Sequence, residues 1–168
     1  MIHEQDAFFR IVPKLRYLDR SVASPDELEQ QARENEEDIR RFSGEKVKFG
    51  AAIQLQHCAS GMYVAVQKQH SGKFAVLQDS PGDAAHFFVM PAFTTENVGD
   101  AVRITNTVQF VSVVFEDARI HVASNGKVAA SNTEVRSKFT IDCVSSLESE
   151  SVGSAVKSSS HITFYDGR

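Results

Sequence analysis

The chain has 168 residues, enough for one domain with a well-buried core and too few for two domains of ordinary size. Its 42% hydrophobic and 24% charged residues are typical of a globular protein, and nothing approaches the run of about 18 apolar residues that a membrane-spanning helix needs. The net charge of −4 excludes the broad positive field that would attract nucleic acid or an anionic membrane.

The first residues, MIHEQDAFFRIVPK, carry acidic side chains where a secretory signal carries basic ones, so we expect a cytosolic segment. Within them, Ala7 to Val12 predict a single strand that Pro13 brings towards its end. Cys58 and Cys143 lack the CxxC spacing of a zinc or redox site. In a cytosolic protein they are expected to be small, reduced core residues.

The segment from Ser24 to Gly44, SPDELEQQARENEEDIRRFSG, predicts a helix. Ser24 is a capping residue, a proline follows at the first helical position, and Glu27 completes a capping box. Acidic residues crowd the beginning, whereas Arg40 and Arg41 precede Gly44. The charges therefore oppose the helix dipole, and the glycine can end the helix.

The predicted helix has only a thin apolar stripe, formed by Leu28, Ala32, Ile39 and Phe42, because Asn35 occupies the middle of the face that should be buried. We therefore expect an arm that projects from the body and packs on a neighbouring domain or subunit. The alternative is a helix that lies flat on its own sheet. The candidate interaction residues of the arm are Asp26, Glu29, Arg33, Glu36, Glu37 and Arg40.

From Lys46 to Val144 apolar residues alternate in short runs separated by turn residues, which predicts all-β structure. The runs also repeat. The stretch GAAIQLQH at Gly50 matches GDAVRITN at Gly99, and AHFFVMP matches SKFTIDC further along the chain. A repeat of about 50 residues corresponds to a four-strand unit.

Two four-strand units do not close a barrel, but a third would. The stretch FFRIVP at Phe8 resembles the last strand of the same unit, so we predict a β-trefoil with a truncated first lobe and an inserted α-helical arm. The predicted barrel-filling side chains are Ile53, Leu55, Val64, Val66, Phe88, Met90, Val102, Ile104, Ile120, Val122, Phe139 and Ile141, with Phe9 and Ile11 in the places of Phe88 and Met90.

These segments resemble a known family. The stretches VKFGAAIQLQHCASGMYVAVQK, HFFVMPAF, VGDAVRITN and SKFTIDCV are similar to the amino-terminal trefoil of the inositol trisphosphate receptors and, to a lesser degree, of the ryanodine receptors, within the wider group of MIR-containing trefoils. The stretch FFRIVPKLRYLDR and the acidic helix after it resemble the strand, the Pro-x-x-Arg-Tyr segment and the helical arm of the suppressor domain of inositol trisphosphate receptors. The Pro-x-x-Arg-Tyr positions are Pro13, Arg16 and Tyr17.

The resemblance implies a non-catalytic regulatory domain of an intracellular ligand-gated calcium-release channel, at the cytosolic face of the endoplasmic reticulum or another calcium store. The implied partners are the ligand-binding core of the same channel and the neighbouring subunits of a tetramer. In this family inositol trisphosphate is held by the following domains, so the resemblance implies only indirect contact with it here, and no cofactor. The family's suppressor domain also begins with further strands, which are absent before Phe8.

The domain organisation follows from the same resemblance. We expect the trefoil over residues 1–145 with its arm at 24–44, a serine-rich linker over 146–160, and the start of a following domain at 161–168. A second hypothesis is that His161 to Tyr165 adds to the sheet edge that the missing strands leave open, in its own copy or in another.

No catalytic or metal-binding motif stands out. The histidines show no helical i, i+4 pair, no GxSxG elbow is present, and the glycines are scattered singly rather than forming a phosphate cradle. We therefore expect no enzyme and no resident metal. A local anion-binding patch is a weaker hypothesis, and its candidates are Lys46, Lys48, Lys68 and Lys73.

The competing hypothesis from another class is a carbohydrate- or ligand-binding MIR trefoil of a secretory-pathway protein. It predicts aromatic side chains for sugar stacking on exposed turns, yet the sequence has no tryptophan and its three tyrosines do not recur at the repeat period. A purely structural trefoil, such as an actin-bundling module, is a third alternative.

Overall fold

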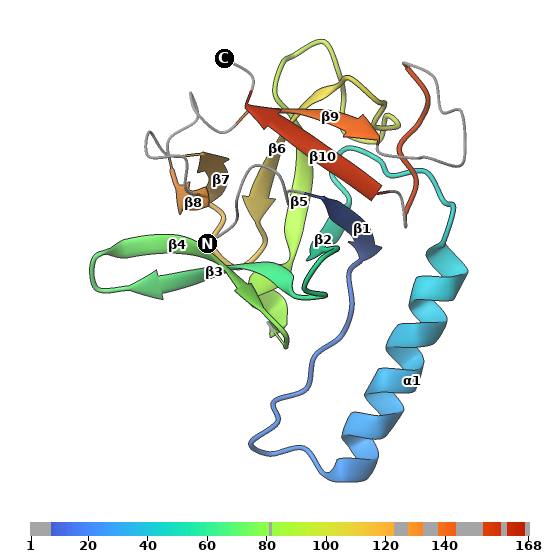
Figure 1. Cartoon of the computed structure of the whole chain (residues 1–168), viewed down its shortest axis with the longest axis vertical. Helices are drawn as coiled ribbons and strands as arrows, with labels where there is room; N and C mark the ends of the chain where they lie inside the picture. Colours follow the sequence, from blue (N-terminus) through green and yellow to red (C-terminus); the bar gives the residue numbers. More distant parts are fainter. Residues whose placement is uncertain are drawn as a thin grey trace.

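The computed structural model describes residues 8–80, 82–122, 128–132, 138–143, 153–158 and 161–166. These residues form a twisted β-sheet structure beside one long helix, which stands next to the sheet and extends beyond it (Figure 1). The strands are β1 (Phe9–Pro13), β2 (Ala52–His57), β3 (Tyr63–Gln69), β4 (Gly72–Gln78), β5 (Phe87–Pro91), β6 (Thr107–Ser112), β7 (Arg119–Val122), β8 (Val128–Ser131), β9 (Phe139–Cys143) and β10 (His161–Asp166); the helices are α1 (Pro25–Phe42) and the short 3-10 helix η2 (Gly82–Ala85).

Six of these strands pair in a closed antiparallel ring. Going round the ring, β1 pairs with β2, β2 with β5, β5 with β6, β6 with β9, β9 with β10, and β10 with β1. Closing the ring leaves no free edge among these six strands. The hairpins β3–β4 and β7–β8 continue from β2 and β6, and the buried side chains of Val64, Val66 and Ile120 face the core from them.

Strand β10 completes the barrel. It pairs with β9 from Ile162 to Asp166 and with β1 at His161 and Ile162. The edge that the sequence leaves open beside β1 is therefore occupied by a strand of the same chain. The division of the chain at residue 145 stays a prediction.

Three segments preceding barrel strands form a ring around one axis. The Val47 N–H donates to the Val156 carbonyl, the Val102 N–H to the Val47 carbonyl, and the Val156 N–H to the Val102 carbonyl, each at 2.8 Å. All three valines are buried, and each lies three residues after a glycine with φ between +81° and +99°: Gly44, Gly99 and Gly153. This cyclic arrangement is the pseudo-threefold symmetry of a β-trefoil, so the predicted all-β fold with an inserted helix is confirmed.

The structure corrects the predicted alignment of the repeats. Gly99 corresponds to Gly44 and Gly153, not to Gly50, and β2 corresponds to β6, a strand that the sequence reasoning had left out. Val102 and Ile104 therefore correspond to Val47 and Phe49 in the ring segments. The error arose because the first repeat has a glycine before its ring segment, Gly44, and another before its strand, Gly50, whereas the second repeat has a glycine only before its ring segment, Gly99.

A second correction concerns β5. Phe88 and Met90 were predicted to fill the barrel, but they are only half-buried, whereas Phe87 and Val89 are fully buried. In the run FFVM both sets of alternate residues are apolar, Phe87 with Val89 and Phe88 with Met90, so periodicity alone cannot show which set faces the core. The backbone pairing of β5 places Phe87 and Val89 there. The Gly50 N–H donates to the Val89 carbonyl just as the Thr105 N–H donates to that of Ile141.

The other predicted core positions are buried wherever the structure describes them: Ile53, Leu55, Val64, Val66, Val102, Ile104, Ile120, Phe139, Ile141, Phe9 and Ile11. The side chain of Val122 lies outside the described residues, as does that of Cys143. Cys58 was expected in the core but is exposed, because it lies in the turn that follows β2.

The ring geometry makes a testable prediction about Thr105, which corresponds to Gly50. Thr105 has φ +77°, a conformation that costs an L-amino acid about 1–2 kcal/mol. Thr105→Gly should therefore raise the free energy of unfolding by up to about 1 kcal/mol. Gly50→Ala, at φ +86° and with Val98 Cγ1 2.6 Å from the added Cβ, should lower it by at least about 1 kcal/mol.

Urea denaturation of the two variants measures both effects. Thr94→Gly, at an exposed loop residue outside the positive-φ set, is the matched control and should be destabilising. A Thr105→Gly variant as destabilised as Thr94→Gly would contradict the assigned backbone strain.

Candidate functional site

The most prominent feature outside the barrel is the arm, which consists of α1 and the preceding strap, residues 14–23. The strap leaves the end of β1 and runs away from the barrel, and α1 returns along it so that the helix ends beside the barrel (Figure 1). The helix therefore stands off the sheet with the strap beside it. This position favours the projecting arm over a helix lying flat on its own sheet.

The predicted capping box at the start of α1 is present. The Glu27 N–H donates to the Ser24 hydroxyl at 3.3 Å, and the Ser24 N–H donates to the Glu27 carboxylate at 2.7 Å. The Ser24 N–H and the Ser24 hydroxyl both donate to the Glu27 carboxylate, and these two bonds hold the pKa of that carboxyl below its ordinary value. The helix ends at Phe42, and Gly44 follows with φ +81°. Its N–H donates to the Ser158 carbonyl, which ties the end of the helix to a ring segment of the barrel.

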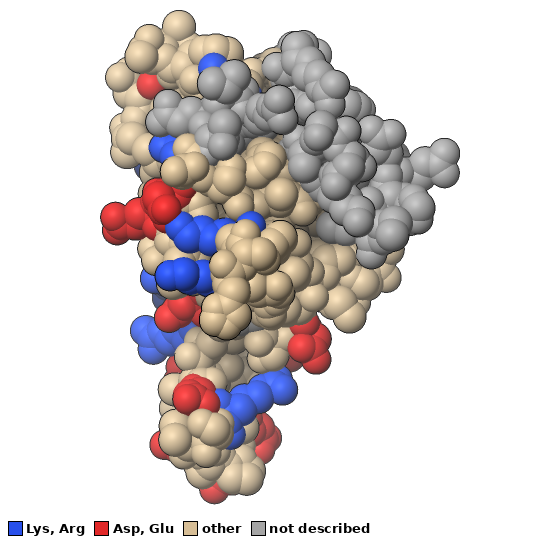
Figure 2. Space-filling model, turned by 90° about the vertical axis from the view of Figure 1, so that its left-hand side faces the viewer, with Lys and Arg blue, Asp and Glu red and all other residues tan. Residues whose placement is uncertain are grey.

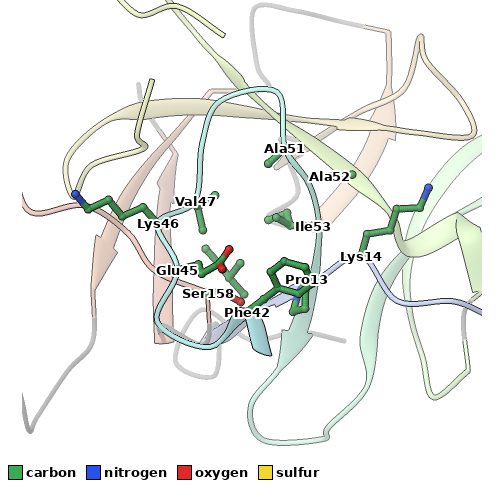
Figure 3. A pocket seen from close by; sticks show the side chains of 11 residues that line it. Pro13, Lys14, Phe42, Glu45, Lys46, Val47, Ala51, Ala52, Ile53 and Ser158 are labelled. Atoms are coloured by element: carbon green, nitrogen blue, oxygen red, sulfur yellow. The ribbon is translucent and has the colours of Figure 1, made fainter. Parts of the chain in front are cut away.

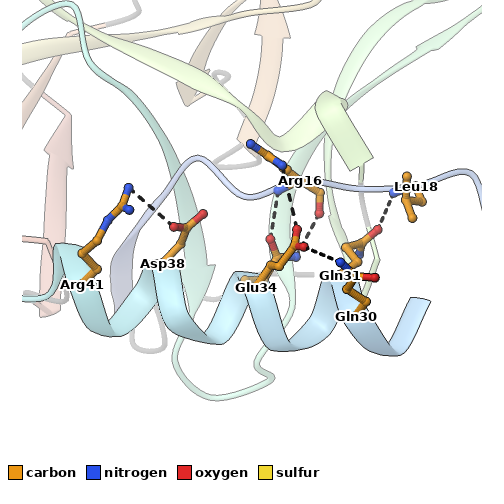
Figure 4. Close-up of polar contacts among 8 residues, drawn as sticks. Arg16, Leu18, Gln30, Gln31, Glu34, Asp38 and Arg41 are labelled. Atoms are coloured by element: carbon orange, nitrogen blue, oxygen red, sulfur yellow. Dashed lines mark hydrogen bonds and ion pairs between the residues drawn. The ribbon is translucent and has the colours of Figure 1, made fainter. Parts of the chain in front are cut away.

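Two amide side chains, four residues apart on one face of α1, hold the strap. Asn35 Oδ1 accepts from the Arg16 N–H at 3.1 Å, and Asn35 Nδ2 donates to the Arg16 carbonyl at 2.9 Å. Gln31 Oε1 accepts from the Leu18 N–H (Figure 4). Asn35 was interpreted as an interruption of the buried face. Asn35 is instead buried against the strap. Its amide satisfies both the N–H and the carbonyl of Arg16, as the backbone of a neighbouring strand would.

The opposite side of the strap faces the barrel. The Leu15 N–H donates to Gln54 Oε1 at 3.2 Å, and Gln54 Nε2 contacts the Tyr17 hydroxyl at 2.7 Å. Gln54 is completely buried because β2 has the core on one face and the strap on the other. Burial raises the pKa of Tyr17 to about 12, although its contact with Gln54 acts in the opposite direction.

His86, next to Tyr17, is completely buried between η2 and β5. The two rings are 5.8 Å apart at their centroids. His86 Nδ1 lies 3.2 Å from Asp83 Oδ1. Burial, helped by the charge of Lys14, lowers the pKa of His86 despite the opposing effects of the Asp83 carboxylate and of a hydrogen bond with the Leu15 backbone.

The predicted interaction residues lie on the face of α1 that points away from the strap. All six are exposed: Asp26, Glu29, Arg33, Glu36, Glu37 and Arg40. Arg33 pairs with Glu29 and Arg40 with Glu36 one turn apart. Exposed pairs of this kind add only about 0.3–0.5 kcal/mol each, so the fold depends little on this charged stripe. Figure 2 shows acidic and basic side chains interspersed over the narrow lower end of the molecule, where the arm lies.

The structure divides the predicted anion patch between two places. Lys46 and Lys48 belong to a ring segment at the end of the barrel. Their backbones form isolated antiparallel β-bridges with Lys157 and Ala101. Lys68 and Lys73 face each other across the β3–β4 hairpin instead, and Lys73 forms an ion pair with Asp117. The four lysines therefore do not form one site.

Other site chemistries find no support in the part of the chain that the structure describes. No group of three His, Cys, Asp or Glu side chains there is arranged to hold a metal ion. The described helices include none that is both long and apolar enough to cross a membrane.

The sequence reasoning missed Gln54 and His86 because both were treated as ordinary polar residues of a sheet with one solvent-facing side.

Comparison with known proteins agrees with this architecture. Residues 4–153 match the family model described as "Inositol 1,4,5-trisphosphate/ryanodine receptor". One relative is the inositol 1,4,5-trisphosphate receptor itr-1 of Caenorhabditis elegans, which is 29% identical over 84 residues. That match covers 46% of this chain and only 3% of the relative.

The amide pair predicts how the arm is stabilised. Asn35→Ala leaves the N–H and carbonyl of Arg16 without their partner, so the free energy of unfolding should fall by about 1–3 kcal/mol. Amide hydrogen exchange at Arg16 should accelerate as well. Glu37→Ala, at an exposed position of the same helix, is the control and should change stability by less than about 0.5 kcal/mol. Equal effects of the two substitutions would contradict the role of Asn35.

His86 predicts a dependence of stability on pH. The unfolded chain takes up a proton near the ordinary histidine pKa of 6.5, whereas folded His86 resists protonation. Its contribution to the free energy of unfolding is therefore constant above pH 6.5 and falls as the pH drops below that value. His86→Phe, which keeps a ring but cannot be protonated, should lose less stability than the parent between pH 7.5 and pH 5.5 in urea denaturation.

The control for this measurement is His70→Phe, at an exposed position between β3 and β4, which should keep the pH dependence of the parent. An unchanged pH dependence in His86→Phe would contradict the assigned effect of burial on His86.

Proposed function

The chain belongs to the inositol 1,4,5-trisphosphate/ryanodine receptor family, and we propose that it is the suppressor-type regulatory domain of an inositol trisphosphate receptor. In this proposal it has no catalytic role. The intact channel lies in the membrane of the endoplasmic reticulum or another calcium store, and the domain occupies its cytosolic face. It couples ligand binding in the adjacent core to opening of the gate.

The observation that carries the proposal is the two-sided arm. One face of α1 is occupied by the strap through Gln31 and Asn35, while the charged stripe on the other face is exposed and contributes little to the fold. A solvated helix that is held to the strap by the side-chain amides of Gln31 and Asn35 is suited to a protein contact of defined geometry. The proposed partners are the ligand-binding core and a neighbouring subunit of a tetramer.

The proposed mechanism is thermodynamic. The domain contacts its partners more favourably in the arrangement of the channel that has low ligand affinity, so removing those contacts raises the affinity. Coupling free energies between sites are typically about 1–3 kcal/mol, which corresponds to about 5–150-fold in affinity. Inositol trisphosphate reaches this domain only through the conformation of the adjacent one.

The experiment uses the full channel that carries this domain. In one variant the charged stripe is neutralised by Glu29→Gln, Glu36→Gln and Glu37→Gln, which touch neither the strap nor the barrel. Ligand affinity should rise at least about fivefold, and ligand-gated calcium flux should decrease. Deleting residues 24–44 should impair the flux in the same direction.

The matched control neutralises three exposed acidic side chains away from the arm by Asp79→Asn, Asp100→Asn and Glu116→Gln, so its net charge changes by the same amount as in the stripe variant. It should leave both affinity and flux as in the parent channel. Unchanged flux and affinity in the stripe variant would refute the role assigned to the arm, and equal effects in the control would show that net charge, not the arm, is responsible.

A further inference from the structure

A cavity of about 310 Å³ lies at the root of the arm, where the end of α1 meets β1 and β2 (Figure 3). Its walls are mainly apolar and include Ile11, Pro13, Phe42, Val47, Ala52 and Ile53. An apolar cavity of about 150 Å³ is sufficient for a benzene molecule. The cavity therefore has room for an aromatic ring with a short substituent.

One buried polar group of this cavity has no hydrogen-bond partner in the part of the chain that the structure describes. Ser158 is 9% exposed, and its hydroxyl makes no hydrogen bond with the described residues. The backbone of Ser158 is fixed on both sides, since its N–H donates to the Glu45 carbonyl at 2.7 Å and its carbonyl accepts from the Gly44 N–H at 3.0 Å. A buried hydroxyl without a partner is unfavourable, so a ligand that hydrogen-bonds to it gains affinity.

Three ionisable side chains line the cavity, and Glu45 is the acidic one. The Glu45 side chain lies at the cavity beside Ser158, whereas the chains of Lys14 and Lys46 extend away from it on opposite sides (Figure 3). The Glu45 carboxylate and a hydroxyl without a partner among the described residues thus meet at the edge of an apolar space, and together they favour a ligand that carries a positive charge and a hydrogen-bond donor.

We propose that this cavity binds a small amphipathic amine. The apolar body occupies the space between Phe42, Ala52 and Ile53, and the ammonium group donates to the Ser158 hydroxyl and faces the Glu45 carboxylate. The cavity has walls from the arm and from the barrel. An occupant therefore bridges the two and favours the arm orientation seen here.

The test compares three probes of similar size that differ in charge: 2-phenylethylamine, 2-phenylethanol and 3-phenylpropionate. Each is titrated into the 168-residue chain while the backbone amide resonances of Ala52 and Ile53 are followed by NMR. The amine should bind at least about threefold more tightly than the alcohol, and the carboxylate more weakly than either. Equal affinities for the three probes, or no shift at Ala52 and Ile53, would overturn the proposal.

Variants separate the groups involved. Glu45→Gln should weaken the amine about three- to fivefold and leave the alcohol unchanged, because Glu45 is exposed, while Ser158→Ala should weaken both. Ala52→Leu should block both probes by filling the cavity. Lys46→Gln, next to Glu45 but extending away from the cavity, is the matched control and should bind the amine within about twofold of the parent.

Thermal unfolding of each variant shows that it is folded, and Glu45→Gln and Ser158→Ala keep the test decisive where Ala52→Leu does not fold. An amine affinity that is unaffected by both Glu45→Gln and Ser158→Ala would place the amine elsewhere and overturn the assignment. None of these outcomes depends on the channel or on the charged stripe of α1.

Discussion

The ring of backbone hydrogen bonds between Val47, Val102 and Val156 is the constraint on which the rest of the structure depends. Each valine donates to one neighbour and accepts from the other, so no segment can leave without orphaning a buried donor and a buried acceptor. The three segments lead into β2, β6 and β10. Their mutual pairing therefore sets where each of these strands begins, and with it the register of the barrel.

The arm is attached to this barrel without interrupting it. The chain leaves at the end of β1 and returns to the ring segment just before Val47, and the strap between them alternates its contacts in a regular way. The Leu15 N–H bonds to Gln54 of the barrel, and the next N–H, that of Arg16, bonds to Asn35 of the helix. One extended segment thus joins helix and barrel through buried amides, where direct apolar packing between them would have needed a wider stripe on α1.

Local chemistry made much of this predictable. The capping box is recognised from two residue types three positions apart, Ser24 and Glu27. The helix begins at Pro25, directly after the predicted cap. The two-residue period of the strands and their repetition indicated a trefoil. The family resemblance agrees with the matched family model, and it rests on residues spread over most of the chain.

The predictions were wrong where both sets of alternate residues in a strand are apolar, as at Phe87 and Phe88. They were also wrong where a polar residue has its hydrogen-bond partner in a distant segment, as Gln54 has in the strap. In both cases the deciding interaction joins residues far apart in the sequence, which periodicity alone does not contain.

Gly44 gives the arm a mechanical property. The 18 residues of α1 make a rod about 27 Å long, and its base is fastened to the third lobe through the bond between the Gly44 N–H and the Ser158 carbonyl. Because the strap braces the rod along its side, a tilt of the barrel carries the rod with it. A tilt of about 10° displaces the far tip by about 5 Å, from the rod length alone. A neighbour holding that tip would sense small reorientations of the trefoil in magnified form.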